Sequence, residues 1–248
     1  MAQQVARSGW VQVSRRRPGA RLRLICLPPA GGGASTYRDW PGQLPDEVEV
    51  VSAQLPGRES RFTESPIASM EQLAGPLLAG LDDYLERPFA LFGHSMGALI
   101  AFELARRLRL GGVQPVHLFA SGCRAPHLPS RSHWHTLPDG QFLTALQELG
   151  GIPPELLAEP EFLAAMLPTL RSDCTLSETY QSSARALLSC PVSAFGGLRD
   201  KDVPPEDVQA WSHHTTGPFQ IHLLPGDHFF LHSARPELLQ LVVSKLQH

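Results

Sequence analysis

The sequence predicts an α/β fold, with one central and mostly parallel sheet and helices on both faces. Three observations lead to this prediction. Apolar strand-like runs alternate with amphipathic helical segments, without a long linker between them. A G-x-S-x-G sequence lies between one such run and the helix that follows it. The composition, 42% hydrophobic and 18% charged over 248 residues, is that of one ordinary globular domain, so we expect 1–248 to form a single domain.

The first half of the chain alternates strand and helix regularly. Ser69 and Gln72 make a capping box at the start of one helix, and Gly111-Gly112 ends another. In chain order, we expect strands over 24–27 and 47–55, a helix from 69 to about 85, a strand ending at 92, a helix over 98–110 and a strand over 116–121.

The alternation is interrupted between about 128 and 188. This segment has helical patterns at 142–149, 155–158 and 161–180, punctuated by prolines, and no strand between them. We therefore expect a helical lid inserted over the sheet. Two further strands follow it, at 191–197 and 219–225.

Residues 91–98 read L-F-G-H-S-M-G-A and predict a nucleophile elbow. In such an elbow the serine lies on a strained turn between strand and helix, and the glycines two positions on either side let neighbouring backbone pack closely. Ser95 is therefore the candidate nucleophile. Together with the parallel sheet, the motif predicts the α/β-hydrolase fold, in which an acid and then a histidine follow the serine along the chain.

The loops after the last two strands provide that acid and that histidine. Asp200 follows the strand at 191–197 with the spacing G-x-x-D-x-x-V, so we prefer it as the acid, and Asp202 is the alternative. His228 follows the final strand and is the candidate base. Among the other histidines, His213 and His214 lie in a polar stretch and His222 lies inside a strand, which favours surface or structural roles.

An oxyanion hole requires backbone N–H groups beside the serine. Met96 directly follows the nucleophile, and the turn P-P-A-G-G-G at 28–33 follows the first strand, so we expect the N–H groups of Ala30 and Met96 to bind the oxyanion. The glycines let backbone approach a ligand, and we expect Gly31 to contact substrate. This turn lacks the G-K-S/T and G-x-G-x-x-G patterns of nucleotide-binding loops.

Four motifs together resemble the type II thioesterases, the stand-alone editing hydrolases of polyketide and nonribosomal peptide synthases. The chain is similar also to the thioesterase that releases medium chains from animal fatty acid synthase. The resemblance extends from about Arg21 to Leu246, and L-P-G-R-E is a motif that a general esterase has no reason to carry. The motifs are P-P-A-G-G-G at 28–33, L-P-G-R-E at 55–59, G-H-S-M-G at 93–97 and L-P-G-D-H-F-F at 224–230.

This resemblance implies hydrolysis of acyl thioesters carried on the phosphopantetheine arm of acyl or peptidyl carrier proteins. It also implies a helical lid, whose apolar residues either pack on the core or line an acyl channel, and substrate contact by Phe229. Two alternatives remain: a carboxylesterase or lipase acting on oxygen esters, and a non-catalytic docking subunit of a synthase. The L-P-G-R-E motif disfavours the first, and the complete Ser-Asp-His set disfavours the second.

Carrier proteins are typically acidic, so a chain with a net charge of −3 requires a local basic surface to bind one. Arg58 and Arg61 follow the L-P-G turn, and Arg124 and Arg131 flank the start of the insertion. We expect these arginines to form the docking surface. The alternative is that they are solvated or form structural ion pairs, for example with Glu59 and Glu64.

The remaining features argue against other classes of protein. The negative net charge argues against nucleic-acid binding, and no run approaches the ~20 apolar residues of a membrane span. Cys26, Cys123, Cys174 and Cys190 lack C-x-x-C spacing, which indicates reduced buried thiols and a cytoplasmic location. His133-Trp134-His135 has no partner set at ligand spacing. We expect a monomer that needs no cofactor or metal.

Overall fold

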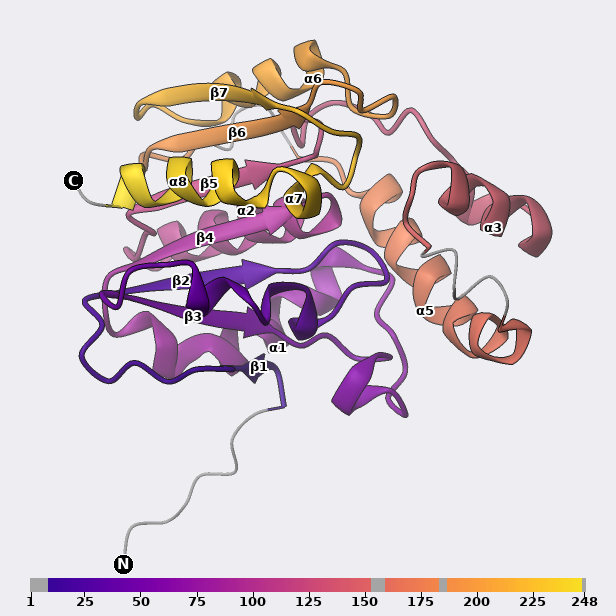
Figure 1. The fold of residues 1–248 in the computed structure, drawn as a ribbon, viewed down its shortest axis with the longest axis horizontal. Coiled ribbons are helices and arrows are strands. Elements are labelled where there is room, and N and C mark those ends of the chain that lie inside the picture. The colour runs from indigo at the N-terminus through magenta and orange to yellow at the C-terminus, as the bar shows by residue number, and fades with distance from the viewer. Residues whose placement is uncertain (1–8, 153–158, 183–186, 247–248) are drawn as a thin grey trace, which may run out of the picture.

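The fold is described from a computed structural model, which describes residues 9–152, 159–182 and 187–246. Its centre is a seven-stranded sheet of order β1-β3-β2-β4-β5-β6-β7 (Figure 1). Every neighbouring pair is parallel except β1 and β3. The predicted α/β-hydrolase fold is thus confirmed.

The strands agree with the predicted ones to within a few residues, except that the two-residue edge strand β1 was not predicted. Strands β3, β4, β5 and β6 are buried along their whole length, as expected for parallel strands covered on both faces. The strands are β1 (Val11–Gln12), β2 (Leu22–Leu27), β3 (Val48–Ala53), β4 (Phe89–His94), β5 (His117–Ser121), β6 (Val192–Gly197) and β7 (Phe219–Leu224).

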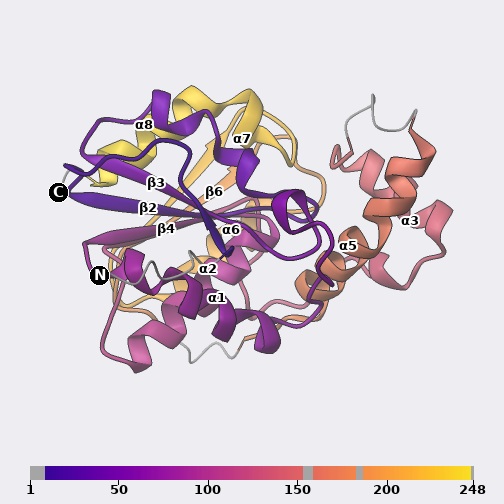
Figure 2. The same cartoon turned by 90° about the horizontal axis from the view of Figure 1, so that it is seen from below.

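Helices cover both faces of this sheet. Residues of α1, α2 and α6 pack in the apolar cluster on one face, and residues of α8 pack with Tyr37 and Trp40 in the cluster on the other face (Figure 2). The α-helices are α1 (Met70–Leu85), α2 (Met96–Leu110), α3 (Asp139–Glu148), α5 (Pro160–Thr179), α6 (Pro205–Gln209), α7 (Phe230–Ser233) and α8 (Arg235–Leu246).

One helix cap and one helix start differ from the prediction. Ser69 is the N-cap of α1, but its side chain makes no capping hydrogen bond, so the predicted capping box is wrong; the first turn is closed by the Leu73 N–H, which donates to the Ser69 carbonyl at 3.0 Å. Helix α2 begins two residues before the predicted start, because the Ser95 carbonyl already accepts the Ala98 N–H at 2.9 Å.

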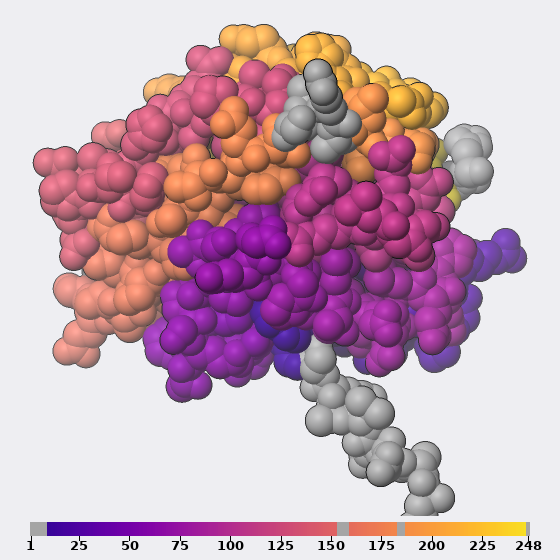
Figure 3. Space-filling view, turned by 180° about the vertical axis from the view of Figure 1, so that it is seen from behind, coloured from indigo at the N-terminus to yellow at the C-terminus, as the bar shows by residue number. Residues whose placement is uncertain are grey.

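Helices α3 and α5 lie beyond the end of the sheet, between β5 and β6 in the sequence (Figures 1 and 2). They share a small apolar cluster, whose buried members are Phe142, Leu146, Ile152, Leu170 and Cys174. The C-terminal end of α5 borders a hollow together with the start of α1, and Figure 3 shows their surfaces in orange and purple.

The helix predicted at 155–158 lies outside the described residues. No helix in the described ranges is long and apolar enough to cross a bilayer.

Candidate active site

Ser95 lies in the tight turn between β4 and α2. Its backbone has φ +54° and ψ −122°, a left-handed conformation that L residues rarely adopt, and its N–H donates to the Ser121 carbonyl at 2.7 Å. A Cβ added to Gly93 would lie 2.0 Å from the Gly97 carbonyl oxygen, and one added to Gly97 would lie 2.1 Å from that of Leu27. The turn therefore requires glycine at both positions of the motif.

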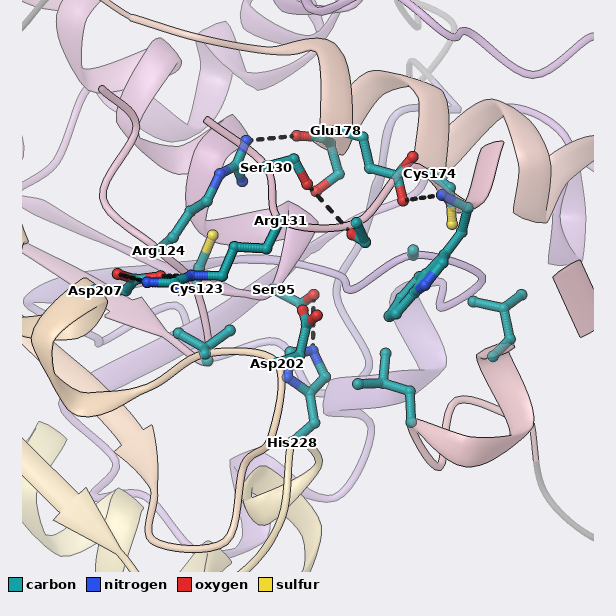
Figure 4. A pocket seen from close by; sticks show the side chains of 18 residues that line it. Ser95, Cys123, Arg124, Ser130, Arg131, Cys174, Glu178, Asp202, Asp207 and His228 are labelled. Atoms are coloured by element: carbon teal, nitrogen blue, oxygen red, sulfur yellow. Dashed lines mark hydrogen bonds and ion pairs between the residues drawn. The ribbon is translucent and has the colours of Figure 1, made fainter. Parts of the chain in front are cut away.

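One hydrogen-bonded chain joins Ser95, His228 and Asp200. The His228 Nε2 lies 3.0 Å from the Ser95 Oγ, and its Nδ1 lies 2.8 Å from the Asp200 Oδ2 (Figure 4 shows the first contact). The His228 and Asp200 side chains are 3% and 0% exposed. With its proton on Nδ1, the ring donates to Asp200 and accepts from the Ser95 hydroxyl, which is the arrangement required of a general base.

The two candidate acids occupy different positions. Asp200 accepts hydrogen bonds at Oδ1 from the N–H groups of Asp202 and Val203, at 2.9 and 3.1 Å, which fixes its other oxygen toward His228. The Asp202 carboxylate instead lines a cavity with Ser95 and His228, and burial raises its pKa. It makes no hydrogen bond or ion pair with any residue that the structure describes. The geometry therefore favours Asp200 as the partner of His228.

The glycine loop, residues 28–33, follows β2 and lies beside Ser95. Ala30 lines the cavity that contains Ser95, while Met96 is buried directly after the nucleophile. Within the described part of the chain, neither N–H donates a hydrogen bond, so both are available to an oxyanion. The Gly31 N–H, in contrast, donates to the Asp173 Oδ2 at 2.8 Å, and Gly31 has φ +72°.

Two cavities meet at Ala30. The first has a volume of about 70 Å³ and is lined by Ser95 and His228 together with both polar and apolar side chains; Figure 4 shows it. The second, of about 250 Å³, lies between the glycine loop and α5 and is mostly apolar. Gly31 and Phe229, the two residues predicted to contact substrate, both line this second cavity. Its other apolar side chains are Pro29, Ile152, Phe162, Leu163, Met166 and Leu170.

Most charged groups of the first cavity are already paired. Arg131 donates two hydrogen bonds to Asp207, both at 2.9 Å. Glu178 pairs with the His135 ring and accepts the Trp134 N–H at 3.0 Å. Two thiols also line the cavity, and burial raises the pKa of the one on Cys123 to about 12. Thiolate chemistry is therefore disfavoured at this site.

The sequence reasoning missed the structural role of His94. Its ring is fully buried, and burial lowers its pKa well below the usual value, so it is neutral. Its Nε2 lies 2.9 Å from the His228 carbonyl oxygen, which only accepts, so Nε2 carries the proton and Nδ1 accepts from the Ser121 hydroxyl at 2.9 Å. His94 thus ties the loop that carries His228 to β4 and β5. The motif letters give no signal for this role, because the middle positions of G-x-S-x-G are unspecified.

Two of the four arginines predicted to dock a carrier protein are buried, and for them the prediction is wrong. Arg58 is 2% exposed and forms an ion pair with Asp173. Arg124 is 8% exposed, and its guanidinium donates to backbone carbonyls, among them that of Leu128 at 3.1 Å. Neither side chain is accessible to a partner protein.

The other two arginines remain at least partly accessible. The Arg61 side chain is only 11% exposed and pairs with Glu64, as the alternative interpretation expected. Arg131 has a 60% exposed side chain and lines the first cavity, although Asp207 already binds its guanidinium.

The remaining histidines and the cysteines have structural positions. His214 is fully buried and its Nε2 lies 2.7 Å from the His127 Nδ1, and the His222 ring stacks on Phe195. The four cysteines are buried and free, as predicted. Among the described residues, no group of three or more metal-ligating side chains comes together.

Comparison with known proteins agrees with this geometry. The profile of the thioesterase domain family matches residues 22–246. The chain is 40% identical over 240 residues to the gramicidin S biosynthesis protein GrsT of Aneurinibacillus migulanus, covering 96% of this chain and 94% of that protein. It is 44% identical over 248 residues to a Brevibacillus parabrevis protein named linear gramicidin dehydrogenase LgrE, with coverages of 98% and 94%.

A solved structure is similar over nearly its whole length. It is the type II thioesterase BorB from the borrelidin biosynthetic cluster, which has a TM-score of 0.88 and 36% identity to this chain. The similarity covers 96% of this chain and 97% of that one.

Proposed function

The chain belongs to the thioesterase domain family, and from this premise we propose that it is an editing type II thioesterase. It would remove acyl groups from the phosphopantetheine arm of carrier proteins in a polyketide or nonribosomal peptide pathway. The observation that carries this proposal is the hydrogen-bonded chain of Ser95, His228 and Asp200 at the wall of a cavity, in a chain similar to type II thioesterases over its whole sheet.

The proposed reaction has two steps. The Ser95 Oγ attacks the thioester carbonyl while His228 takes the hydroxyl proton, and Asp200 stabilises the imidazolium that forms. The tetrahedral intermediate then expels the phosphopantetheine thiolate, which takes up a proton, and leaves an ester on Ser95. Water attacks this ester with His228 again as base, so the products are a free acid and the carrier's thiol.

The N–H groups of Ala30 and Met96 are proposed to bind the oxyanion of both tetrahedral intermediates. Support comes from the position of Ala30 at the cavity that holds Ser95 and from the place of Met96 directly after the nucleophile. Within the described residues, neither N–H has another acceptor. Such donors act strongly in a site from which water is excluded. A thiolate leaves readily, so the enzyme's main tasks are to position the acyl carbonyl and the attacking water.

Carrier proteins of a synthase are the proposed partners. Of the four arginines considered from the sequence, Arg131 has the most exposed side chain and lines the cavity that contains Ser95. A basic group beside that cavity favours association with an acidic carrier protein. We further propose a monomer in the cytoplasm, where the free cysteines would stay reduced.

A redox function, as the name of LgrE suggests for that relative, has little support in this chain. A dinucleotide would require a G-x-G-x-x-G turn after a strand, and the turn after β2 reads P-P-A-G-G-G. The residues that meet at Ser95 are instead a nucleophile, a base and its orienting acid.

The proposal is tested with carrier proteins loaded with acyl groups of different length and polarity, alongside matched acyl-pantetheine thioesters and oxygen esters. Mass spectrometry of the carrier protein reports loss of the acyl group. We expect release of acid from the carrier and a higher kcat/KM on the carrier-bound thioester than on the oxygen ester. Rapid ester hydrolysis without any release from a carrier would instead identify a carboxylesterase.

A further inference from the structure

Arg58 of the L-P-G-R-E motif forms a buried ion pair with Asp173 of α5, and neither the proposed catalysis nor docking explains it. Arg58 donates from Nη1 to the Asp173 Oδ2 at 2.5 Å and from Nη2 to the Asp173 Oδ1 at 2.8 Å. The two side chains are only 3% and 2% exposed. A buried ion pair pays a large desolvation cost and adds little net stability over apolar packing. Its presence calls for a role besides stability.

Both members of this pair contact the glycine loop. The Asp173 Oδ2 accepts the Gly31 N–H at 2.8 Å, and the Arg58 Nη1 also donates to the Gly32 carbonyl at 3.2 Å. The peptide that joins Ala30 to Gly31 is therefore held by a charged acceptor. This peptide and the one that carries the Ala30 N–H are joined at the Ala30 Cα and differ only by its φ and ψ, so holding the first restricts the directions in which the Ala30 N–H can point.

The same face of α5 makes two more contacts, one with the L-P-G-R-E segment at 55–59 and one with the glycine loop. The Thr169 hydroxyl donates to the Gly57 carbonyl at 2.8 Å. A Cβ added to Gly31 would lie 2.5 Å from the Leu170 Cδ2, so the leucine side chain packs directly on the loop. Residues 169, 170 and 173 share one helix face, because side chains three and four apart are neighbours on a helix.

We propose that Asp173 is a positioning residue for the oxyanion hole: from α5, and held by Arg58, it fixes the glycine loop through the Gly31 N–H so that the Ala30 N–H points at the reacting carbonyl. This inference rests on the proposed function. If so, the geometry of the oxyanion hole depends on the position of α5. This helix also lines the second cavity, through Met166 and Leu170.

The pair is tested with Asp173→Asn. This substitution preserves side-chain size but removes the negative charge that binds the Gly31 N–H and the Arg58 guanidinium. Loss of a single oxyanion donor costs about 10²–10³-fold in kcat, and a displaced donor costs less. We therefore expect kcat on a short acyl-pantetheine thioester to fall by roughly 10–100-fold, with KM within about threefold of wild type. Arg58→Lys keeps the charge but loses the two-pronged geometry, so we expect a smaller fall, of about 3–10-fold.

The affinity for an alkyl boronic acid distinguishes a positioning role from a purely structural one, because a purely structural role would leave this affinity unchanged. Its tetrahedral adduct with Ser95 places an oxygen where the oxyanion forms, so its Ki should rise by about the factor by which kcat falls. The matched control is Glu49→Gln, which disrupts the Arg23–Glu49 pair, 11% and 4% exposed, at the far end of the sheet from Ser95. This control should lower thermal stability and leave both kcat and Ki within about twofold of wild type.

A wild-type kcat and Ki in Asp173→Asn would overturn the proposal, as would equal changes in the Glu49→Gln control. If Asp173→Asn does not fold, Arg58→Lys decides the question by the same two readouts, and unchanged values there overturn the proposal. Failure of the proposed function is distinguishable, because wild-type protein would then hydrolyse no thioester while still giving a measurable melting temperature.

Discussion

The proposed catalytic residues and the helices that cover them are held in different ways. Ser95, Asp200 and His228 lie on loops at the ends of β4, β6 and β7, where backbone contacts and missing Cβ atoms fix their positions. Helices α3 and α5 pack around a separate small apolar cluster and contact the glycine loop mainly through the Arg58–Asp173 pair and Leu170.

This difference separates the geometry of the nucleophile turn from the access of substrate to it. The nucleophile turn depends on the most deeply buried part of the molecule, so its geometry should persist until the whole domain unfolds. A segment with a small cluster of its own can open at lower free energy than the core. We therefore expect α3 and α5 to control access to Ser95 without changing its local conformation.

Replacing the nucleophile gives the largest expected effect. Ser95→Ala should lower kcat for acyl-thioester hydrolysis by about 10⁴-fold or more, because no acyl-enzyme can form. The substitution opens no cavity in the apolar core, so the melting temperature should stay near that of wild type. Turnover and thermal melting are measured on the same preparation. Turnover within a few-fold of wild type would show that the reaction does not depend on the nucleophile turn.

The two carboxylates after β6 give the next effect. Asp200→Asn should lower kcat by roughly 10²–10⁴-fold, because the amide no longer holds the imidazole in the tautomer that accepts the serine proton. Asp202→Asn is the matched control, since the two residues share one loop and, of the two carboxylates, Asp200 is the one that hydrogen-bonds to His228. Asp202→Asn should change kcat little. Reversed effects in steady-state kinetics would transfer the acid role to Asp202.

A matched pair of phenylalanines separates the stability of the core from that of the covering helices. Phe92 and Phe142 are both fully buried, the first in the sheet core and the second in the cluster of α3 and α5. Phe92→Ala should lower the global free energy of unfolding by about 3–5 kcal/mol. Phe142→Ala should change the global melting temperature little, and instead speed amide hydrogen exchange in α3 and α5. Equal losses of global stability would show that core and covering helices unfold together.

The smallest effect concerns the thiols that line the first cavity. Burial raises the pKa of Cys123 to about 12 and also raises that of Cys174, so both stay protonated near neutral pH. Only the thiolate is a good nucleophile, so iodoacetamide at pH 8 should leave them unmodified in native protein and label them after unfolding. Mass spectrometry counts the adducts. Rapid labelling of native Cys123 would show that the cavity opens more widely than described.

The sequence predicted those parts of the site that depend on local patterns. The G-x-S-x-G turn and the loops after β6 and β7 follow from glycine spacing and strand order, and they identify the three residues that the structure brings together. Contacts between distant segments were not predictable in this way. Asp173 contacts Gly31 across 142 residues and Arg58 across 115 residues, and His94 contacts His228 across 134 residues. Without these partners, Arg58 looked like a surface cation, although it is buried.

The central claim is that hydrolysis proceeds through an ester on Ser95. Rapid mixing with an acyl-carrier protein, acid quench within the first turnover and peptide mapping by mass spectrometry test it most directly. We expect the acyl mass on the peptide that contains Ser95, its decay as free acid appears, and its absence in Ser95→Ala. An acyl adduct on another residue, or full hydrolysis by Ser95→Ala, would contradict the account.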